Sequence, residues 1–358
     1  MNKVLLLQTS IADYRDHFIR SLNDYFEIEL TIKVGECYFE ESTKTSAYVR
    51  SLENVELVRN LFLFNRKFCF QFIKLSDVLR SDVVVFELNP HLISNWVFML
   101  MRTVLRKKNV LWGHAWSRSG PDSKTELLRA LMRAMSDNLL LYTEEQKTEI
   151  VQSYPKLKNR TYVAPNSLYA AEDMGVASGD SSDVVYVGRL VASKKVDLLI
   201  RSFAKVVARD SSRRLHLIGS GPDYDSLVDL ASKLSVSKYV KFHGHISDFD
   251  RLKEVYGQSL MSISPGYVGL SITQSFAFGR PMLIALDEPH SPELEAFNDG
   301  ENGLFFESDS EESLASAMIE MFDRSAEWSS KFTPIVNHCR NTYSVERMVR
   351  GFVDAVEK

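Results

Sequence analysis

The chain has 358 residues, a formal net charge of −4 and three cysteines. This length predicts about two domains, on a prior of roughly 150 residues each. The content of 45% hydrophobic and 25% charged residues is that of an ordinary soluble globular protein. The negative balance argues against nucleic acid as the main partner, because a surface that binds a duplex is basic.

Cysteine spacing and the N-terminal sequence both favour a cytoplasmic protein. Cys37, Cys69 and Cys339 are too widely separated for a disulfide framework or a metal-ligand spacing, so we expect inert thiols in a reducing compartment. The N-terminal run turns polar after a few apolar residues, which predicts a strand and not a signal peptide. No apolar run reaches the ~18 residues of a membrane span, and the nearest one, residues 92–105, is interrupted by Arg102.

The first half of the chain alternates predicted strands with predicted helices, which indicates a doubly wound parallel sheet. Asp82–Leu88 contains a continuous apolar run, as expected of a strand covered on both faces. Thr143 and Gln146 form a capping-box pattern that predicts the start of a helix. The predicted strands are 4–8, 27–34, 82–88, 110–112, 138–142 and 161–164, and the predicted helices are 13–25, 92–105, 123–135 with Ser123 as N-cap, and one that begins at Thr143.

The α/β pattern restarts after a small, polar, Gly/Ser-rich stretch at 169–182, which we predict to be a linker. We therefore expect two Rossmann-like domains, 1–168 and 183–342, whose sheets face a cleft. The predicted strands of the second domain are 184–187, 215–218, 240–243, 260–263, 282–285 and 304–306, and the predicted helices are 196–208, 223–234, 249–256, 269–279, 311–323, 326–340 and 345–356.

The stretch from Ser264 to Pro281 predicts a ligand site. The apolar run Leu260–Ile263 predicts a buried strand, a Pro-Gly loop follows it, and Gly269 opens a helix that Gly279 closes. A strand that ends in a Gly-rich loop at a helix N-terminus suits phosphate, because the N–H groups of the first turn are unpaired and carry roughly half a positive charge.

A second loop carries two cations. Arg189 and Lys194 lie between a predicted strand that ends at Gly188 and a helix that begins at Val196. They suit a diphosphate, because Arg can bind bidentately and Lys supplies a point charge. Taken alone, the pattern is equally compatible with Arg189 paired to a carboxylate and Lys194 in solvent.

The turn Gly219-Ser-Gly221 follows a predicted strand but is a weak dinucleotide signal. A third glycine is missing and Pro222 occupies an early helix position, so a tight turn is the simpler interpretation. A Rossmann dehydrogenase carries its glycines in the first strand–helix turn, where residues 9–13 have none. The chain also lacks a Walker lysine pattern.

Five motifs follow one another along the second half: Gly188-Arg-Leu with Lys194, Gly219-Ser-Gly-Pro222, Phe242-His-Gly-His-Ile246, Gly269-Leu with Ala277-Phe-Gly-Arg-Pro281, and Asp299-Gly-Glu-Asn-Gly-Leu304. At these spacings they resemble the nucleotide-sugar half of a GT-B glycosyltransferase of family 4, the group 1 glycosyltransferases. The likeness is strong over 183–307 and weaker through 163–167 and the final helix. It implies that the last helix, about 343–358, crosses back onto the first domain.

The resemblance implies a retaining, metal-independent transfer of a hexose from a UDP- or GDP-linked donor to a hydroxyl of a glycan or lipid-linked acceptor. No cofactor is expected beyond the donor. Arg189 and Lys194 match the pair that holds the diphosphate and stabilises its charge as it leaves, which is worth several kcal/mol in order of magnitude. The other donor-binding positions that the resemblance implies are Gly188, Gly219, Gly221 and Glu295.

The sequence departs from the family at its two signature glutamates, which are separated by seven residues. Gly266 and Gln274 occupy those positions. Gln274 retains a carbonyl oxygen for a ribose hydroxyl, although without charge assistance. Gly266 has no side chain to hold the sugar, so we expect that contact from the backbone N–H groups around Val268, Gly269 and Leu270, or from elsewhere.

Three residues of the first domain are candidates at predicted strand ends. By resemblance, His114 in the motif Trp112–Arg118 is expected near the reaction centre as a contact of the donor sugar; a general-base role and a purely structural role are the alternatives. Glu87 and His17 are candidates for the acceptor side, and helix-capping or surface roles suit them equally well.

Two stretches, 59–74 and 96–108, mix aromatic residues with cations and are candidates for contact with an anionic membrane. The second also has the composition of a core helix with a basic end, so the first is favoured. Such contact would locate the protein at the inner face of the membrane, where a transferase builds a surface polysaccharide or glycolipid.

Two other functions remain open. A sugar-nucleotide epimerase of the same architecture needs carboxylates and histidines clustered in the first domain, and the chain offers few. A non-catalytic nucleotide-sugar-binding protein is suggested by Gly266 and Gln274.

Overall fold

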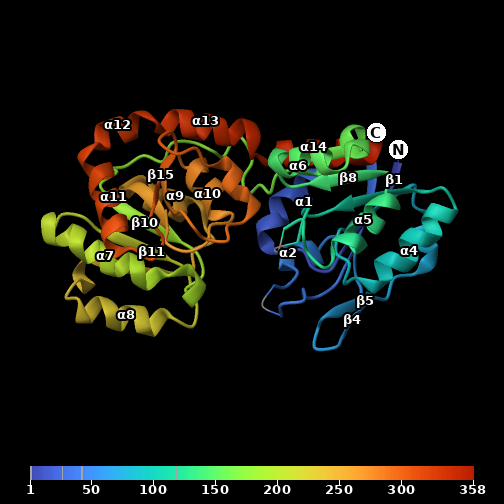
Figure 1. The fold of residues 1–358 in the computed structure, drawn as a ribbon, viewed down its shortest axis with the longest axis horizontal. Helices are drawn as coiled ribbons and strands as arrows, with labels where there is room; N and C mark the ends of the chain where they lie inside the picture. The colour runs from blue at the N-terminus through green and yellow to red at the C-terminus, as the bar shows by residue number, and fades with distance from the viewer. Residues whose placement is uncertain (1, 26, 42, 118–119) are drawn as a thin grey trace. The chain divides into compact units, whose positions relative to one another are not determined.

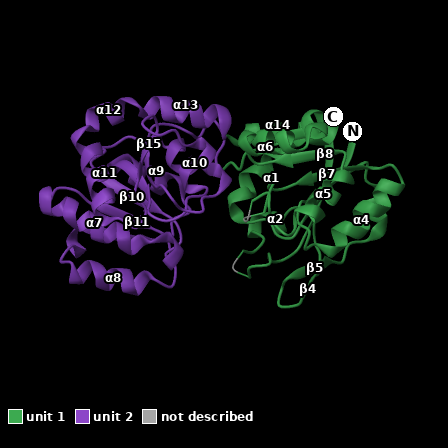
Figure 2. Ribbon diagram, in the orientation of Figure 1, with its two compact units in different colours: residues 1–168, 344–358 green, residues 169–343 purple. Residues whose placement is uncertain are grey.

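The computed structural model describes residues 2–25, 27–41, 43–117 and 120–358 (Figure 1). The chain forms two compact units, and Figure 2 distinguishes them by colour. Unit 1 comprises residues 1–168 together with 344–358, and unit 2 comprises residues 169–343. The final helix therefore belongs to the first unit, as the family resemblance implied.

Unit 1 is built on a parallel sheet with the strand order β3-β2-β1-β6-β7-β8-β9. Its order reverses between β1 and β6, so the carboxyl ends of these two strands mark the topological switch point, where ligands bind in folds of this kind. The strands are β1 (Asn2–Gln8), β2 (Ile28–Val34), β3 (Val55–Leu57), β6 (Val83–Glu87), β7 (Lys108–Trp112), β8 (Asn138–Leu141) and β9 (Thr161–Val163). A separate antiparallel hairpin consists of β4 (Asn60–Leu63) and β5 (Phe68–Gln71).

Successive residues of a strand point to opposite faces of the sheet, and in these strands both sets are apolar. Both faces must therefore be covered, and helices pack on each of them. Val4 and Leu6 pack with residues of α1 and α14, whereas Leu5 and Leu7 pack with residues of α3, α4, α5 and α6. The helices are α1 (Asp16–Asn23), α2 (Ala47–Arg50), α3 (Leu75–Arg80), α4 (Ile93–Val104), α5 (Glu126–Ala134), α6 (Glu144–Ser153) and α14 (Val345–Glu357).

Unit 2 has a second parallel sheet with the order β12-β11-β10-β13-β14-β15. Its switch point lies between β10 and β13, which pair directly. The strands are β10 (Asp183–Val187), β11 (Leu215–Ile218), β12 (Val240–Gly244), β13 (Ser259–Ser264), β14 (Met282–Ala285) and β15 (Gly303–Phe306). The helices are α7 (Val196–Arg209), α8 (Tyr224–Lys233), α9 (Phe249–Gln258), α10 (Ser271–Ala277), α11 (Glu311–Asp323), α12 (Ser325–Ser330) and α13 (Phe332–Thr342).

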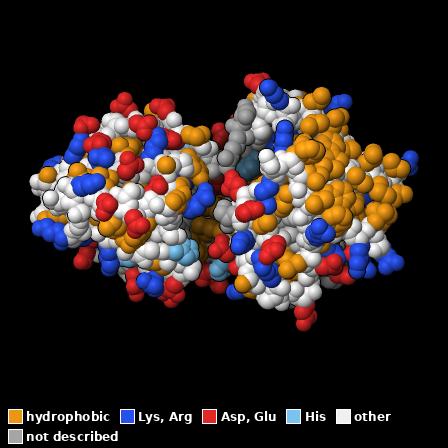
Figure 3. All heavy atoms as spheres, turned by 90° about the horizontal axis from the view of Figure 1, so that it is seen from below, with side chains coloured by type: hydrophobic (Ala, Val, Ile, Leu, Met, Phe, Trp, Pro, Cys, Tyr) orange, Lys and Arg blue, Asp and Glu red, His pale blue; other side chains and the backbone are white. Residues whose placement is uncertain are grey.

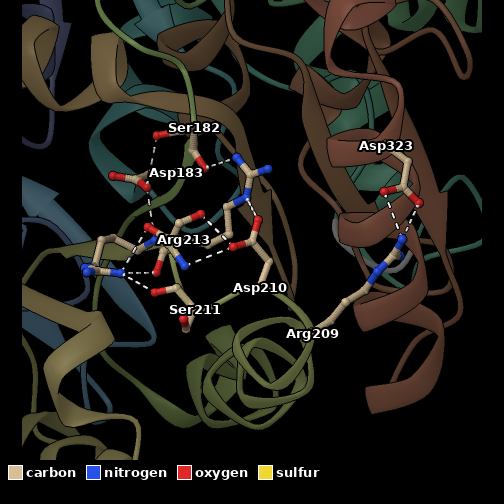
Figure 4. A network of polar contacts seen from close by, with 9 residues as sticks. Ser182, Asp183, Arg209, Asp210, Ser211, Arg213 and Asp323 are labelled. Carbon is tan, nitrogen blue, oxygen red and sulfur yellow. Dashed lines mark hydrogen bonds and ion pairs between the residues drawn. The ribbon is translucent and has the colours of Figure 1, made fainter.

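A polar network lies at the amino end of β10, opposite to the switch-point loops (Figure 4). The Asp183 carboxylate accepts a hydrogen bond from the Arg214 backbone N–H, 3.0 Å away. Arg213 donates to the Asp210 carboxylate at 2.8 Å and to the Ser182 carbonyl at 3.0 Å. These bonds fix the turn between α7 and β11, at the end of the sheet opposite to the switch-point loops.

The predicted elements largely agree with the structure, and β11, β14 and α11 have the predicted bounds. Three predictions of local structure need correction. The predicted helix 13–25 is a 3₁₀ turn (Asp13–Arg15) followed by α1. The helix predicted at 123–135 begins at Glu126, because the Ser123 hydroxyl accepts from the N–H of Thr125 in the preceding turn instead of capping the helix. The helix predicted at 326–340 is divided into α12 and α13.

Residues 169–182, which we expected to be a linker, pack within unit 2. The N–H groups of Gly175 and Ala177 donate to the carbonyls of Ala277 and Phe278 at 3.0 and 3.1 Å. Arg340 also donates to the Ala171 carbonyl at 3.0 Å. The small and polar residues of this stretch therefore allow it to lie against α10 and α13 and form hydrogen bonds there.

The three cysteines are free, and burial raises the pKa of Cys69 and of Cys339 to about 12, which keeps both thiols protonated. Over the described ranges, no helix has both the length and the apolar character that a membrane span requires.

Candidate functional site

The loops that follow β10 and β13 meet at the switch point of unit 2. The loop after β10 carries Arg189 and Lys194, and the loop after β13 runs from Pro265 to Leu270. Lys194 joins the two, since its Nζ donates to the Tyr267 carbonyl at 2.7 Å and lies 3.4 Å from the centroid of the Tyr267 ring. Carbonyl and ring faces both favour a cation, so Lys194 has a defined position.

The two cations of this site have no carboxylate partner among the residues that the structure describes. Arg189 is exposed, and Lys194 is half-buried. Burial, and then the positive charge of Arg189, lower the pKa of Lys194 to about 8. The next residue differs: Lys195 forms ion pairs with Glu288 and Asp309. The loop thus holds uncompensated positive charge at Arg189 and Lys194, and this charge can bind an anion.

Gly266 lies against the cation loop. A Cβ atom added at this position would lie 2.3 Å from the Ser193 carbonyl oxygen and 3.0 Å from the backbone of Lys194. Real Cβ atoms do not approach backbone so closely, so no side chain fits here without a shift of one loop. The packing of this backbone therefore requires glycine at the first signature position. The carboxylate that the family has there is absent.

The loop after β13 is also fixed by His290, a residue that the sequence did not single out. The Val268 N–H donates to His290 Nδ1 at 3.0 Å, and His290 Nε2 lies 2.8 Å from the Ala285 carbonyl oxygen, to which it donates. Burial lowers the pKa of His290, which favours this neutral form. Among the N–H groups around Val268–Leu270 that we expected to contact the donor sugar, that of Val268 is bonded to His290. Gly269 and Leu270 remain candidates.

Gln274, at the second signature position, is partly engaged. Its side-chain N–H donates to the Tyr169 hydroxyl at 2.9 Å, and Tyr169 packs against Phe249 and Phe278. This hydrogen bond fixes the orientation of the Gln274 side-chain amide. Its carbonyl oxygen is the group that can accept a hydrogen bond from a ligand hydroxyl.

Close contacts between two backbone loops explain why two positions of the predicted donor loops are glycine. Gly219 has φ +146°, and a Cβ there would lie 1.8 Å from the Gly188 carbonyl oxygen. At Gly221 the corresponding distance, to the Leu190 carbonyl oxygen, is 2.1 Å. The loops after β10 and β11 touch at these points, and glycine is what allows the contact.

Glu295 lies in the short 3₁₀ turn Pro292–Ala296, where its carboxylate forms a hydrogen bond with the Tyr343 hydroxyl. Burial is the main reason that the pKa of Tyr343 is raised, and the charge of Glu295 raises it further. The structure therefore gives Glu295 a partner at the end of α13.

Unit 1 also gathers polar side chains at its switch point, around a buried arginine. Arg15 NH2 donates to the Tyr142 hydroxyl at 2.8 Å, and its guanidinium lies 4.6 Å from the Trp112 ring centroid. Glu87, at the end of β6, accepts hydrogen bonds from the N–H and the hydroxyl of Thr9. Burial raises the pKa of Glu87, although the Thr9 bonds and Arg15 oppose this shift.

His114 adjoins this cluster. Its ring is exposed and lies 4.7 Å from the Tyr142 ring centroid, and its Nδ1 is 3.4 Å from Gln146 Nε2. His17 is exposed on α1. Arg118, the last residue of the His114 motif, lies outside the described residues.

Arg15 lies in the stretch Tyr14-Arg15-Asp-His17, which was an acceptor-side candidate through His17, and the structure shows that Arg15 connects the unit 1 cluster. Tyr142, its partner, was not singled out in the sequence. Within the described part of the chain, no three His, Cys, Asp or Glu side chains are grouped as ligands of a metal would be.

Two Rossmann-like parallel sheets, each with polar or cationic loops at its switch point, define the GT-B class of glycosyltransferase folds. Solved structures share this fold over nearly the whole chain. HepE of Anabaena, crystallised in complex with UDP, has a TM-score of 0.70 at 16% identity and covers 99% of both chains. A glycosyltransferase from Rickettsia africae has a TM-score of 0.73 at 12% identity, with 99% of this chain and 98% of that chain covered.

The sequence comparisons agree with the resemblance. Residues 172–332, which lie within unit 2, match the model of the group 1 glycosyl transferases, so the resemblance found in the sequence is confirmed for this part of the chain. A D-inositol 3-phosphate glycosyltransferase of Rhodococcus opacus is 29% identical over 243 residues, which are 62% of this chain and 53% of that protein. The chain spans about half the length of this curated relative.

Proposed function

We propose that the protein transfers a hexose from a nucleotide-diphosphate donor to the hydroxyl of a glycan or lipid-linked acceptor, in the manner of a family 4 enzyme. The observation that carries the proposal is the pair Arg189 and Lys194. They lie at the switch point of a group 1 glycosyltransferase domain and have no carboxylate partner among the described residues. A donor diphosphate supplies the missing negative charge.

The two cations act on the leaving group. Arg189 is exposed and can bind the diphosphate bidentately, while Lys194 is held by the Tyr267 carbonyl and presents a point charge. As the glycosidic bond to the donor breaks, negative charge grows on the departing phosphate, and the fixed cations stabilise it. Since this charge comes from side chains, we propose that the reaction needs no metal ion.

The acceptor side is proposed at the unit 1 cluster. His114 is exposed and oriented by Tyr142 and Gln146, which suits a contact with a sugar hydroxyl. The two carboxylates that contact the cation loop, Glu288 and Asp309, are paired with Lys195, so we propose that the acceptor hydroxyl loses its proton to the leaving phosphate, with retention of configuration. UDP is the favoured nucleotide, because HepE was crystallised with it.

The biological setting rests on relatives. An inositol phosphate is the named substrate of the Rhodococcus relative, and an exopolysaccharide phosphotransferase of Streptomyces coelicolor matches over 53% of this chain and 20% of that protein at 29% identity. We propose a role in surface polysaccharide or glycolipid synthesis at the cytoplasmic side of the membrane.

A second candidate is a binding protein that holds a nucleotide sugar without turning it over. Gly266 and Gln274 favour this alternative, because both signature carboxylates are absent. An epimerase is the third possibility.

The test is incubation of the full chain with a panel of UDP-, GDP- and ADP-sugars, followed by measurement of donor hydrolysis and transfer. Arg189→Ala and Lys194→Ala are each expected to lower kcat by about 100-fold or more. Lys205→Ala is the matched control, because Lys205 is a partly exposed cation of the same unit that is already paired with Glu311 and Glu312. Equal turnover in all three variants would contradict the diphosphate assignment. Tight binding without turnover would favour the second candidate, and C2 epimerisation the third.

A further inference from the structure

Two neighbouring helices of unit 1, α4 and α5, cover one face of its sheet. They are the connections from β6 to β7 and from β7 to β8, and their inward residues Phe98, Met99 and Met132 share one apolar core cluster. Their carboxyl-terminal ends are bonded, since the Thr103 hydroxyl donates to the Met135 carbonyl at 3.2 Å. The outward sides of the two helices therefore form one continuous surface.

This outward surface is apolar as well. Val97, Leu100 and Val104 recur at helical spacing along α4, and Val104 is 73% exposed. Figure 3 shows hydrophobic side chains gathered on one face of this unit, with Lys and Arg around them. A contiguous exposed apolar patch of this kind marks an interaction site in soluble proteins. We define the α4–α5 face by its exposed residues Val97, Leu100, Val104, Leu105, Leu127, Leu128 and Leu131.

Exposed cations flank the α4–α5 face along the chain. Residues 88–135 contain eight Lys and Arg but only two Asp and Glu, and two of the cations, Arg102 and Arg133, are buried. Glu126, one of those two acids, forms an ion pair with the buried Arg133. Arg106, after the end of α4, and Lys124, before the start of α5, are both exposed, and neither has an ion-pair partner among the described residues.

We propose that the α4–α5 face docks unit 1 onto a membrane surface that contains anionic lipid. An apolar helical face with cations at its margin sinks about 5–10 Å into the boundary between headgroups and acyl chains, where its cations meet lipid phosphates. A second copy of the chain fits less well, because the same basic margins would then face each other and repel. The docking does not depend on the proposed sugar transfer, since it needs no donor.

The structure also reverses the ranking of the two membrane candidates. The favoured stretch, 59–74, forms the β4–β5 hairpin, and Phe64 and Phe72 are exposed there. Its Arg66 pairs with Glu41, but Arg59, Lys67 and Lys74 are exposed without an ion-pair partner among the described residues, so cations occur in both stretches. The exposed apolar side chains of the α4 stretch continue onto α5, and this larger apolar surface makes it the better candidate.

The experiment is co-sedimentation of the full chain, without donor, with vesicles of phosphatidylcholine alone or of phosphatidylcholine mixed with an equal amount of phosphatidylglycerol. The wild type is expected to bind the mixed vesicles and to release them as NaCl is raised. Leu100→Glu with Leu131→Glu is expected to weaken binding more than tenfold, because apolar insertion is lost and charge is reversed. Arg106→Gln with Lys124→Gln is expected to weaken it about thirtyfold, at ~1 kcal/mol for each cation.

The matched control is Leu57→Glu with Val228→Glu, which makes the same change at two exposed apolar residues outside the α4–α5 face and is expected to bind as the wild type does. Donor hydrolysis by Leu100→Glu with Leu131→Glu should stay at the wild-type level, which separates loss of docking from loss of the donor site. Binding unchanged by these two substitutions would overturn the proposal. The proposal would also be overturned if the wild type bound no vesicles but formed a dimer in solution that Leu100→Glu with Leu131→Glu dissociates.

Discussion

The two units place polar side chains at the same topological position but treat charge in opposite ways. In unit 2, Arg189 and Lys194 project from the switch-point loop without a carboxylate partner in the described structure. In unit 1, the guanidinium of Arg15 is buried between Tyr142 and Trp112, and Glu87 is bonded to Thr9. The cations of unit 2 are accessible to an anion, whereas Arg15 is buried and held by the neutral Tyr142 hydroxyl and the Trp112 ring, with its Nε unpaired among the described residues. This difference supports our proposal of a charged donor on unit 2 and an uncharged acceptor hydroxyl on unit 1.

The largest expected effect comes from restoring the family residue. Gly266→Glu supplies the first signature carboxylate, yet its Cβ would meet the Ser193 carbonyl oxygen at 2.3 Å and displace the loop that carries Lys194. We expect affinity for UDP, measured by calorimetry, to fall at least a hundredfold, on the order of the cost of overpacking. Gly175→Ala is the control, because a Cβ there meets nothing within 4 Å. Wild-type UDP affinity in Gly266→Glu would show that the two loops do not need this contact.

Arg15 and Arg189 are expected to contribute differently to the free energy of unfolding. Arg15→Ala removes a buried side chain with a hydrogen bond and a ring contact, so we expect the free energy of unfolding to fall by about 3 kcal/mol. Arg189→Ala removes an exposed side chain and should change it by less than about 0.5 kcal/mol. Urea denaturation followed by circular dichroism gives both values. Similar losses in the two variants would remove the distinction between a structural and a ligand-directed cation.

The smallest expected effect is the pH dependence of donor binding. Lys194 has a pKa of about 8, so it is largely protonated at pH 7 and loses its charge as the pH rises through that value. We expect affinity for a UDP-sugar to be flat up to about pH 7.5 and to fall about tenfold by pH 9. Lys194→Arg should bind without this loss, since Arg stays charged. An identical pH profile in the wild type and Lys194→Arg would exclude Lys194 from the donor site.

The free energy of unfolding should rise with pH over part of the range in which donor affinity falls. The folded-state pKa of Lys194 lies below the value of about 10.4 expected in an unfolded chain, so the unfolded state binds this proton more strongly between the two values. The contribution of Lys194 to the free energy of unfolding therefore rises with pH from about 8 to about 10, while donor affinity declines.

Much of the fold could be predicted from the sequence, because long apolar runs and helical periodicity determine elements such as β11, β14 and α11 locally. The β4–β5 hairpin was missed, since its aromatic residues suggested a membrane contact and its turn has no glycine. Arg189 and Lys194 could be placed on one loop, because their position relative to the strand end and the helix start is also local.

The rest of the site depends on contacts between distant segments. The role of His290 appears only when the fold brings its Nδ1 to the Val268 N–H, and no local pattern indicates it. Gly266 was interpreted as an absent carboxylate, whereas the structure shows the close approach of another loop. Arg15 and Tyr142 likewise meet only because β1 and β8 lie in one sheet.

The assignment of α14 to unit 1 has a consequence for synthesis on the ribosome. Phe352 packs against Phe18 and Trp112, with ring centroids 5.9 and 5.7 Å apart, so it completes the core of unit 1. The ribosome must translate all of unit 2 between Leu168 and Ser344, which takes on the order of ten seconds or more at roughly 5–20 residues per second. Unit 2 can therefore finish folding first, while the nascent unit 1 keeps an apolar surface uncovered during that interval.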